Sequence, residues 1–334
     1  MNCNRFSAVL ILAFLSFSTV AVADDGFLQQ GNVQTNQSQS YIDGRLSAEV
    51  YGGYLQGVAK EIVYDVPAAG QKGPKISELD WQIDNAAIAG GRVAYAALPW
   101  LNIRANAWTK VDSDNAIDDY DWLAGYNGKS SWSDWSHHDD TDLIHAYNTD
   151  ISTSSRLFAT GGTTITGLLG YRYENYKWKV RGGSYTYSTS GTLRDAIGTF
   201  PNGELVGSYQ QSWHIPYAGL GFAQKFGGWK VSGEAIGTPF AIVHDEDNHY
   251  LTTTNYKDNF SRSNMVGVSG GMEYSLTKHI SLTGNAEYQN MFEAKGKVKA
   301  TDTDTGAVAY APKPTSGASL ETYTVRAGLK YTFH

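Results

Sequence analysis

The last segment of the chain alternates apolar and polar residues. Val325, Leu329 and Phe333 occupy one set of alternating positions, and Arg326 and Lys330 occupy the other. Successive side chains of a β-strand point to opposite faces, so this segment predicts a strand with one apolar and one largely polar face. The same period of two recurs elsewhere in the chain, including segments 228–244, 262–277 and 279–294.

We predict ten strands along the chain. Several exceed the roughly 9–11 residues that cross a bilayer, so they should project beyond the membrane on one side. Closing the sheet into a barrel satisfies every backbone polar group in lipid, which an open sheet cannot do. The predicted strands cover residues 44–64, 76–98, 100–112, 142–158, 162–181, 207–225, 228–244, 262–277, 279–294 and 319–333.

The connections between the predicted strands alternate in length. Short turns on one side and long loops on the other are typical of a bacterial outer-membrane barrel. The predicted fold class is therefore all-β, a ten-stranded antiparallel transmembrane β-barrel with short periplasmic turns and long extracellular loops. The tight turns lie at 98–100, 159–161, 226–228 and 277–279, and the long connections cover 65–75, 113–141, 182–206, 245–261 and 295–318.

The first 23 residues have the pattern of a secretory signal peptide. Arg5 is their only charged residue, an apolar run extends from Phe6 to Val20, and a small-x-small cleavage site ends at Ala23. The alternative is a membrane anchor, but the run is shorter than the roughly 20 apolar residues that a spanning helix needs. We expect cleavage of residues 1–23 and a mature chain, 24–334, that forms a single barrel domain.

The composition fits this fold and narrows the range of partners. The chain has 22 Tyr, 9 Trp and 36 Gly, which suits a barrel with aromatic girdles and a wet interior. Its single cysteine, Cys3, lies in the predicted signal peptide, so the mature chain has no disulfide and no cysteine metal site. The formal net charge of −7 argues against nucleic acid, which needs a basic patch, and favours a cationic substrate.

Two pairs of polar residues in the long connections have i, i+2 spacing. Asp119 and Asp121 form the first pair, and Asp247 and His249 form the second. If the strands continue into these segments, both members of a pair face the same side. Crowded carboxylates raise one another's pKa, and a carboxylate beside histidine favours the imidazolium, which is a basis for acid–base catalysis. The alternative is that these acidic loops are only solvated surface.

Two other chemistries are compatible with the same segments. The run 244–249 could bind a divalent ion, and segment 112–123 begins like a calcium loop. However, Ile117 stands where that loop needs Gly and Leu123 where it needs Glu. Ser136 with a histidine could act as a nucleophile, although no G-x-S-x-G motif supports it. We expect no required metal.

Taken in order, several segments resemble the omptin family of outer-membrane aspartate/histidine proteases. The resemblance extends over essentially the whole mature chain. It implies a barrel whose rim faces the cell exterior and cleaves peptides and proteins next to Arg or Lys. The matching segments are 76–81 with 85–87, 119–122, 132–141, 181–185, 200–204, 245–250 and 328–333.

The resemblance also implies the catalytic residues. His249 would act as the general base on a water molecule, and Asp247 would orient its ring and stabilise its charged form. Asp119 and Asp121 would form the opposing couple that holds the water and the scissile carbonyl. No acyl-enzyme is implied.

Further residues match the substrate-binding and supporting positions of the family. Glu61 and Asp245 would line the pocket for the basic side chain before the scissile bond, where a buried guanidinium needs a charge-assisted partner. Asp134 would favour a basic residue after the bond. Ser136 and His138 would support the catalytic residues.

Family members bind lipopolysaccharide phosphates on the barrel exterior through a Tyr/Glu/Arg/Arg/Lys cluster and need that lipid for activity. Tyr171 matches this cluster, and Lys177 shares its strand face. Tyr173, Asn175 and Ser212 replace the Glu and the two Arg. The resemblance thus implies lipopolysaccharide as an activator and no cofactor within the active site.

The leading hypothesis is an outer-membrane endopeptidase with peptide, protein and lipopolysaccharide partners and no nucleic-acid partner. The alternatives are a non-catalytic adhesin or receptor barrel of the same fold, and a lipid-modifying barrel. The complete catalytic set favours the protease, because a binding protein needs none of it. A lipid hydrolase would need a Ser/His pair at the level of the lipid.

Overall fold

The computed structural model describes residues 45–65, 73–123, 131–189 and 191–333. The predicted signal peptide, 1–23, lies outside the described residues. In the described part, the chain contains no helix that is long and apolar enough to cross a membrane.

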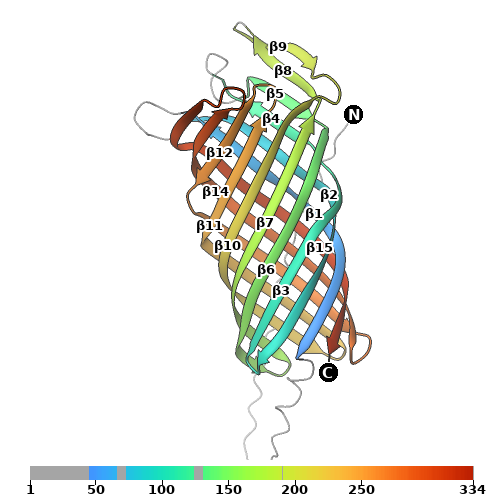
Figure 1. Cartoon of the computed structure of the whole chain (residues 1–334). Helices are drawn as coiled ribbons and strands as arrows, with labels where there is room; N and C mark the ends of the chain where they lie inside the picture. Colours follow the sequence, from blue (N-terminus) through green and yellow to red (C-terminus); the bar gives the residue numbers. More distant parts are fainter. Residues whose placement is uncertain (1–44, 66–72, 124–130, 190, 334) are drawn as a thin grey trace, which may run out of the picture. The chain divides into compact units, whose positions relative to one another are not determined.

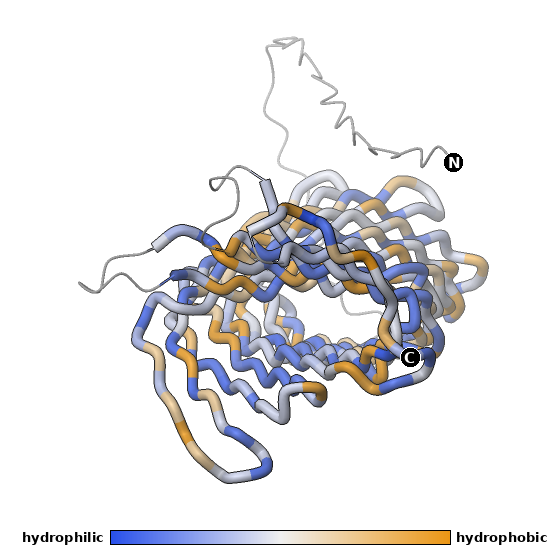
Figure 2. Tube along the Cα trace, turned by 90° about the horizontal axis from the view of Figure 1, so that it is seen from above, coloured by the Kyte–Doolittle hydropathy of each residue, from blue (hydrophilic) through white to orange (hydrophobic). Residues whose placement is uncertain are grey.

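The strands form one antiparallel sheet that closes on itself, as Figures 1 and 2 show. β1 (Leu46–Tyr64) pairs with both β2 (Lys75–Leu98) and β15 (Val308–Phe333). Closure gives each wall strand two neighbours, so the predicted ten-stranded antiparallel barrel is confirmed. The other wall strands are β3 (Leu101–Asp114), β6 (Asp140–Thr160), β7 (Thr163–Arg181), β10 (Leu205–Phe226), β11 (Trp229–His249), β13 (Ser263–Ser275) and β14 (Ile280–Asp302).

Further strands occupy segments that the sequence pattern predicts as long loops. This part of the prediction is wrong, because these segments pair with one another and with the projecting ends of the wall strands. Beyond the membrane both faces of a hairpin can meet water, so the apolar alternation that marks a strand is lost. Figure 1 shows β8 and β9 at the end of the barrel opposite the C-terminus. The additional strands are β4 (Ile117–Asp121), β5 (Asp134–His138), β8 (Ser184–Thr189), β9 (Thr192–Thr199) and β12 (Thr254–Phe260).

The apolar face of the wall strands points outward. On β15, Val325 is 62% exposed and Leu329 is 51% exposed, whereas Arg326 between them is 7% exposed. A strand of a water-soluble sandwich would bury its apolar face instead. The inverted arrangement is that of a sheet whose outer side meets lipid and whose inner side is polar.

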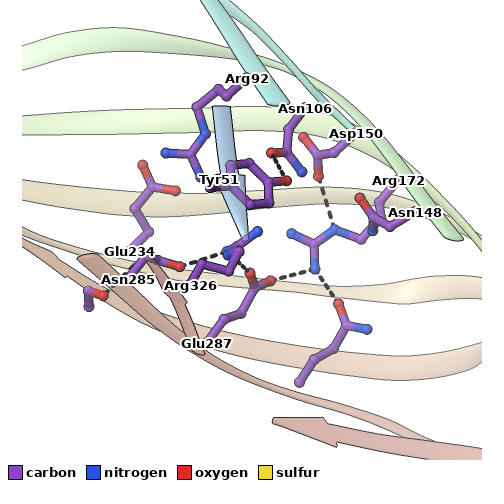
Figure 3. Close-up of polar contacts among 12 residues, drawn as sticks. Tyr51, Arg92, Asn106, Asn148, Asp150, Arg172, Glu234, Asn285, Glu287 and Arg326 are labelled. Atoms are coloured by element: carbon purple, nitrogen blue, oxygen red, sulfur yellow. Dashed lines mark hydrogen bonds and ion pairs between the residues drawn. The ribbon is translucent and has the colours of Figure 1, made fainter. Parts of the chain in front are cut away.

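Charged side chains form ion pairs inside the barrel, both between neighbouring strands and across it (Figure 3). Arg172 of β7 and Arg326 of β15 both donate to Glu287 of β14, at 2.7 and 2.6 Å. Arg104 of β3 pairs with Glu234 of β11 at 2.5 Å. These residues line a cavity of about 530 Å³ that lies on the side of the short turns, away from the projecting strands.

A layer of aromatic side chains fills the barrel between this polar network and the projecting strand ends. Trp81 of β2 stacks on Tyr209 of β10 with ring centroids 4.8 Å apart, and Trp178 of β7 lies 5.9 Å from Trp81. The indole of Trp213 donates to Gln211 at 2.9 Å. This buried layer forms a rigid floor for the polar residues at the mouth of the barrel.

Candidate active site

The projecting end of β11 carries Asp247 and His249 toward the inside of the barrel. They follow buried Val243 at alternate positions, so all three face the same side. The Nε2–H of His249 donates to Asp247 Oδ2. The Asp247 side chain is 4% exposed and that of His249 is 44% exposed. The Asp247 carboxylate is thus shielded from water, whereas the His249 imidazole remains accessible to water.

Asp119 and Asp121 lie on β4, which continues the line of β3 after a short interruption. In the antiparallel pairing of β4 with β5, Asp119 is opposite Ser136 and Asp121 is opposite Asp134. The strand therefore does continue into the second long connection, and the two aspartates share a face as their i, i+2 spacing predicts.

The two couples act on each other electrostatically. Burial and the charge of Asp121 raise the pKa of Asp119 to about 8. Burial raises the pKa of Asp121 to about 6, against hydrogen bonding from Ser77. Burial lowers the pKa of His249, but its hydrogen bond to Asp247 and the charges of Asp247, Asp119 and Asp121 outweigh this effect, so the pKa is raised. Charges on β4 and β11 thus interact across the mouth, although the couples are far apart in sequence.

The raised carboxyl pKa values make the stability of the fold depend on pH. Between the ordinary value of 3.8 and the folded values of about 8 for Asp119 and about 6 for Asp121, the folded chain binds more protons than the unfolded chain. Stability is then lost as pH rises through this window. We expect the thermal midpoint in detergent to fall between about pH 4 and about pH 9, and to fall less in Asp119→Asn. Circular dichroism measures both midpoints, and equal slopes would contradict the assignment.

A cluster of buried carboxylates, called the acidic pocket below, lies beside the Asp247–His249 dyad. Glu61 of β1 and Asp245 of β11 are both buried, and Tyr209 donates to Asp245 Oδ2 at 3.0 Å. Burial and neighbouring carboxylates raise the pKa of Glu61 and of Asp245 well above their ordinary values. A third buried carboxylate, Asp258 of β12, lies directly opposite Asp245 in the strand pairing. Asp258 was not predicted as a site residue, because segment 245–261 was predicted as a loop. The i, i+2 spacing of Tyr256 and Asp258 is too short a pattern to indicate a strand.

The acidic pocket contains no cation in the described part of the chain. None of the ion pairs there includes Glu61, Asp245 or Asp258. Glu61 Oε2 and Asp258 Oδ1 are buried and have no hydrogen-bond partner. Because a buried carboxylate without a partner is unfavourable, the pocket is suited to a cationic group supplied from outside.

Asp134 is anchored by the hairpins beside the Asp119–Asp121 couple. It accepts hydrogen bonds from Ser133 Oγ at 2.6 Å and from the Ser188 amide at 2.9 Å. Its charge contributes to the raised pKa of Asp121, after the larger effect of burial. Asp134 therefore adds negative charge on the β4 side of the mouth, away from the acidic pocket.

Ser136 and His138 form a buried hydrogen-bonded pair on β5. His138 Nδ1 lies 2.5 Å from the Gly182 carbonyl oxygen, to which it must donate, so its Nε2 accepts from the Ser136 hydroxyl at 3.1 Å. Gly183 has a φ of +109°, and a Cβ there would lie 2.4 Å from His138 Nδ1. Only glycine fits this contact. Ser136 is 2% exposed, which prevents direct attack on a substrate without rearrangement.

The residues predicted to contact lipopolysaccharide lie on β7. Tyr171 is exposed and its hydroxyl is 2.6 Å from His214 Nδ1. Lys177 shares the strand face of Tyr171, as predicted, because it lies an even number of residues away. Asn175, on the same face, donates to Ser212 at 2.6 Å, so these two replacements satisfy each other.

Within the described residues, no group of three or more His, Cys, Asp or Glu side chains is arranged to hold a metal ion.

The fold and the site together define a class of protein, namely outer-membrane β-barrels with a carboxylate–histidine centre at the mouth of the barrel. The omptin family model matches residues 42–333. Protease 7 of Escherichia coli O157:H7 is 30% identical over 304 residues, covering 90% of this chain and 94% of that protein. The plasminogen activator of Yersinia pestis is 29% identical, covering 84% of this chain and 87% of that protein.

The comparison with solved structures agrees with the sequence matches. The crystal structure of the outer membrane protease OmpT from Escherichia coli matches with a TM-score of 0.82 at 29% identity, covering 87% of this chain and 98% of that chain. The chain belongs to the omptin family, and it is an outer-membrane protease.

Proposed function

We propose that this protease is an endopeptidase that cleaves peptides and proteins next to basic residues, at the exterior face of the outer membrane. The observation that carries the proposal is the electrostatic interaction between the Asp247–His249 and Asp119–Asp121 couples beside an acidic pocket without a cation. A non-catalytic adhesin or receptor barrel would need neither couple.

In the proposed reaction, a water molecule bound between the couples attacks the scissile carbonyl carbon. Because Nε2 of His249 is hydrogen-bonded to Asp247, Nδ1 is the ring nitrogen that takes the proton from the water. Asp247 stabilises the resulting imidazolium. The proton then passes to the leaving amine as the C–N bond breaks, which restores the neutral imidazole.

The Asp119–Asp121 couple would hold the other side of the reacting group. With a pKa of about 8, Asp119 is protonated at neutral pH. Its proton can then be donated to the carbonyl oxygen as negative charge develops there, and it returns to Asp119 when the C–N bond breaks and the C=O bond re-forms. The ionised Asp121 accepts a hydrogen bond from the water. Two carboxyl groups with different pKa values can in this way serve as donor and acceptor.

Specificity would come from the acidic residues on either side of this centre. Glu61 and Asp245 offer charge-assisted hydrogen bonds to the basic side chain before the scissile bond. Asp134 places negative charge on the opposite side, which favours a basic residue after the bond. The absence of a competing cation among the described residues supports the first of these roles.

We further propose lipopolysaccharide as an activator that binds the outer face of β7 through Tyr171 and Lys177. The mutual hydrogen bond of Asn175 and Ser212 removes two positions from phosphate binding, so the dependence on this lipid should be weaker than a full basic cluster would give.

The proposed function is tested with refolded protein in detergent and a fluorogenic peptide containing Arg-Arg or Arg-Lys. We expect cleavage that increases when lipopolysaccharide is added, and no cleavage of a matched peptide with glutamine at both positions. EDTA should leave the rate unchanged once the lipid is bound. A folded protein that cleaves neither peptide with lipid present would support the non-catalytic alternative, and loss of activity in EDTA would support a metal site.

Ser136→Ala distinguishes a supporting serine from a nucleophile. Since its hydroxyl donates to His138 within the protein, we expect kcat to fall less than about tenfold, in line with the loss of roughly 1 kcal/mol of hydrogen bonding. Steady-state kinetics on the Arg-Arg peptide gives the value. A loss of several thousandfold with the fold intact would instead indicate covalent catalysis.

A further inference from the structure

Asp258 faces Asp245 across the pairing of β11 and β12. The two are directly opposite each other, so their Cβ atoms are roughly 5 Å apart on the inner face of the sheet. Like charges at such positions destabilise a sheet, and both side chains are buried. The Asp245 and Asp258 carboxylates therefore repel each other, and a cation bound between the two side chains would relieve this repulsion.

No neighbouring element neutralises Asp258 in the described chain. Glu61 from β1 and Asp245 and Asp247 from β11 add negative charge to its surroundings. The hydroxyl of Tyr209 on β10 is bonded to Asp245. On its other side Asp258 pairs with Val298 of β14, which is uncharged.

The basic residues next to the pocket in sequence point the other way. Lys257 precedes Asp258 but pairs with Glu246 at 3.3 Å. Lys60 precedes Glu61 but pairs with acidic residues of β2 at 2.8 Å. Adjacent residues of a strand face opposite sides, so these lysines lie on the outer face and leave the pocket without a cation.

We propose that Asp258 is a third carboxylate of the pocket for the basic side chain, and that it makes the pocket select a guanidinium over an ammonium. This rests on the proposed function. Glu61 Oε2 and Asp258 Oδ1 lie on different strands, and both atoms are buried without a hydrogen-bond partner. A guanidinium has five donors in a planar fork and bonds to several carboxylates at once, whereas an ammonium is a compact charge with three donors.

The same geometry makes substrate binding depend on pH. Burial, together with the charge of Asp247, raises the pKa of Asp258 to about 6. Glu61 and Asp245 face the same space and are also protonated more readily than usual. A bound guanidinium favours the ionised carboxylates, so KM for an arginine peptide should fall as pH rises through about 6.

The test compares peptides with arginine, lysine or uncharged citrulline before the scissile bond. In Asp258→Asn we expect kcat/KM for arginine to fall about 10- to 100-fold, mainly through KM, because one charged hydrogen-bond acceptor is lost. Lysine should lose less, so the arginine-to-lysine ratio falls, and citrulline should be unaffected. In Asp258→Asn, the decrease of KM for the arginine peptide as pH rises through about 6 should also become smaller. Glu246→Gln, which removes an outward carboxylate from β11, is the matched control and should change neither ratio nor pH profile.

Asp258→Asn should fold, with a higher thermal midpoint, because the substitution removes the repulsion with Asp245; Asp258→Ser is a second variant with the same expected kinetics. An unchanged arginine-to-lysine ratio and KM–pH profile in the folded variants would overturn this inference. If, in that case, Glu61→Gln still reduced cleavage of the arginine peptide in the same assay, the proposed function would be retained and only the role of Asp258 would be rejected. If the unsubstituted protein cleaved no basic peptide, the proposed function itself would fail.

Discussion

His249→Ala is expected to lower kcat on an Arg-Arg peptide by about 10²–10⁴, the usual contribution of a positioned general base. The imidazole is the accessible member of the dyad and is held by buried Asp247. In the proposed reaction, removing the ring leaves the water without an acceptor for its proton. Steady-state rates near neutral pH, with lipopolysaccharide present, provide the measurement.

Asp247→Asn is the companion variant. It keeps the side-chain shape but removes the charge that raises the pKa of His249, so the pH at which His249 loses its proton should decrease. A folded His249→Ala protein with an unchanged rate would exclude this histidine from the reaction.

Glu61→Gln is expected to have the second largest effect, and only on basic substrates. Removing one partner of a buried, hydrogen-bonded charge pair costs roughly 2–5 kcal/mol, which corresponds to about 30-fold or more in kcat/KM. Glu61 is buried on β1, and because glutamine is nearly isosteric with glutamate, we expect the new side chain to occupy the same position. Peptides with arginine and with citrulline before the bond, compared in the same assay, measure the effect.

The outward Glu246→Gln again serves as the control, because its carboxylate pairs with Lys257 on the other face of the sheet. A loss of the same size on the arginine and citrulline peptides would mean that Glu61 supports the fold and does not recognise charge.

The alternation of the wall strands was sufficient to predict the barrel. Lipid on one side and a polar interior on the other require opposite chemistry at successive positions, as Leu329 and Arg326 show on β15. The i, i+2 pairs at the mouth were predictable for a related reason. Once a strand continues into the segment, Asp247 and His249 have to share a face.

The hairpins beyond the membrane were not predictable in this way. Their two faces have no fixed contrast between lipid and water, so β4, β5, β8, β9 and β12 have no strong period of two. Asp258 was missed for this reason, since its role depends on which residue β12 places opposite it.

The sequence by itself determined that this chain forms an exported barrel of ten wall strands, and which carboxylates and histidines its projecting ends carry. Only the tertiary structure decided that the aspartates of β4 act on the dyad of β11, and that Asp258 lies opposite Asp245 without a cation. The physical reason is that a strand's own alternation specifies faces, whereas register and closure of the sheet specify neighbours.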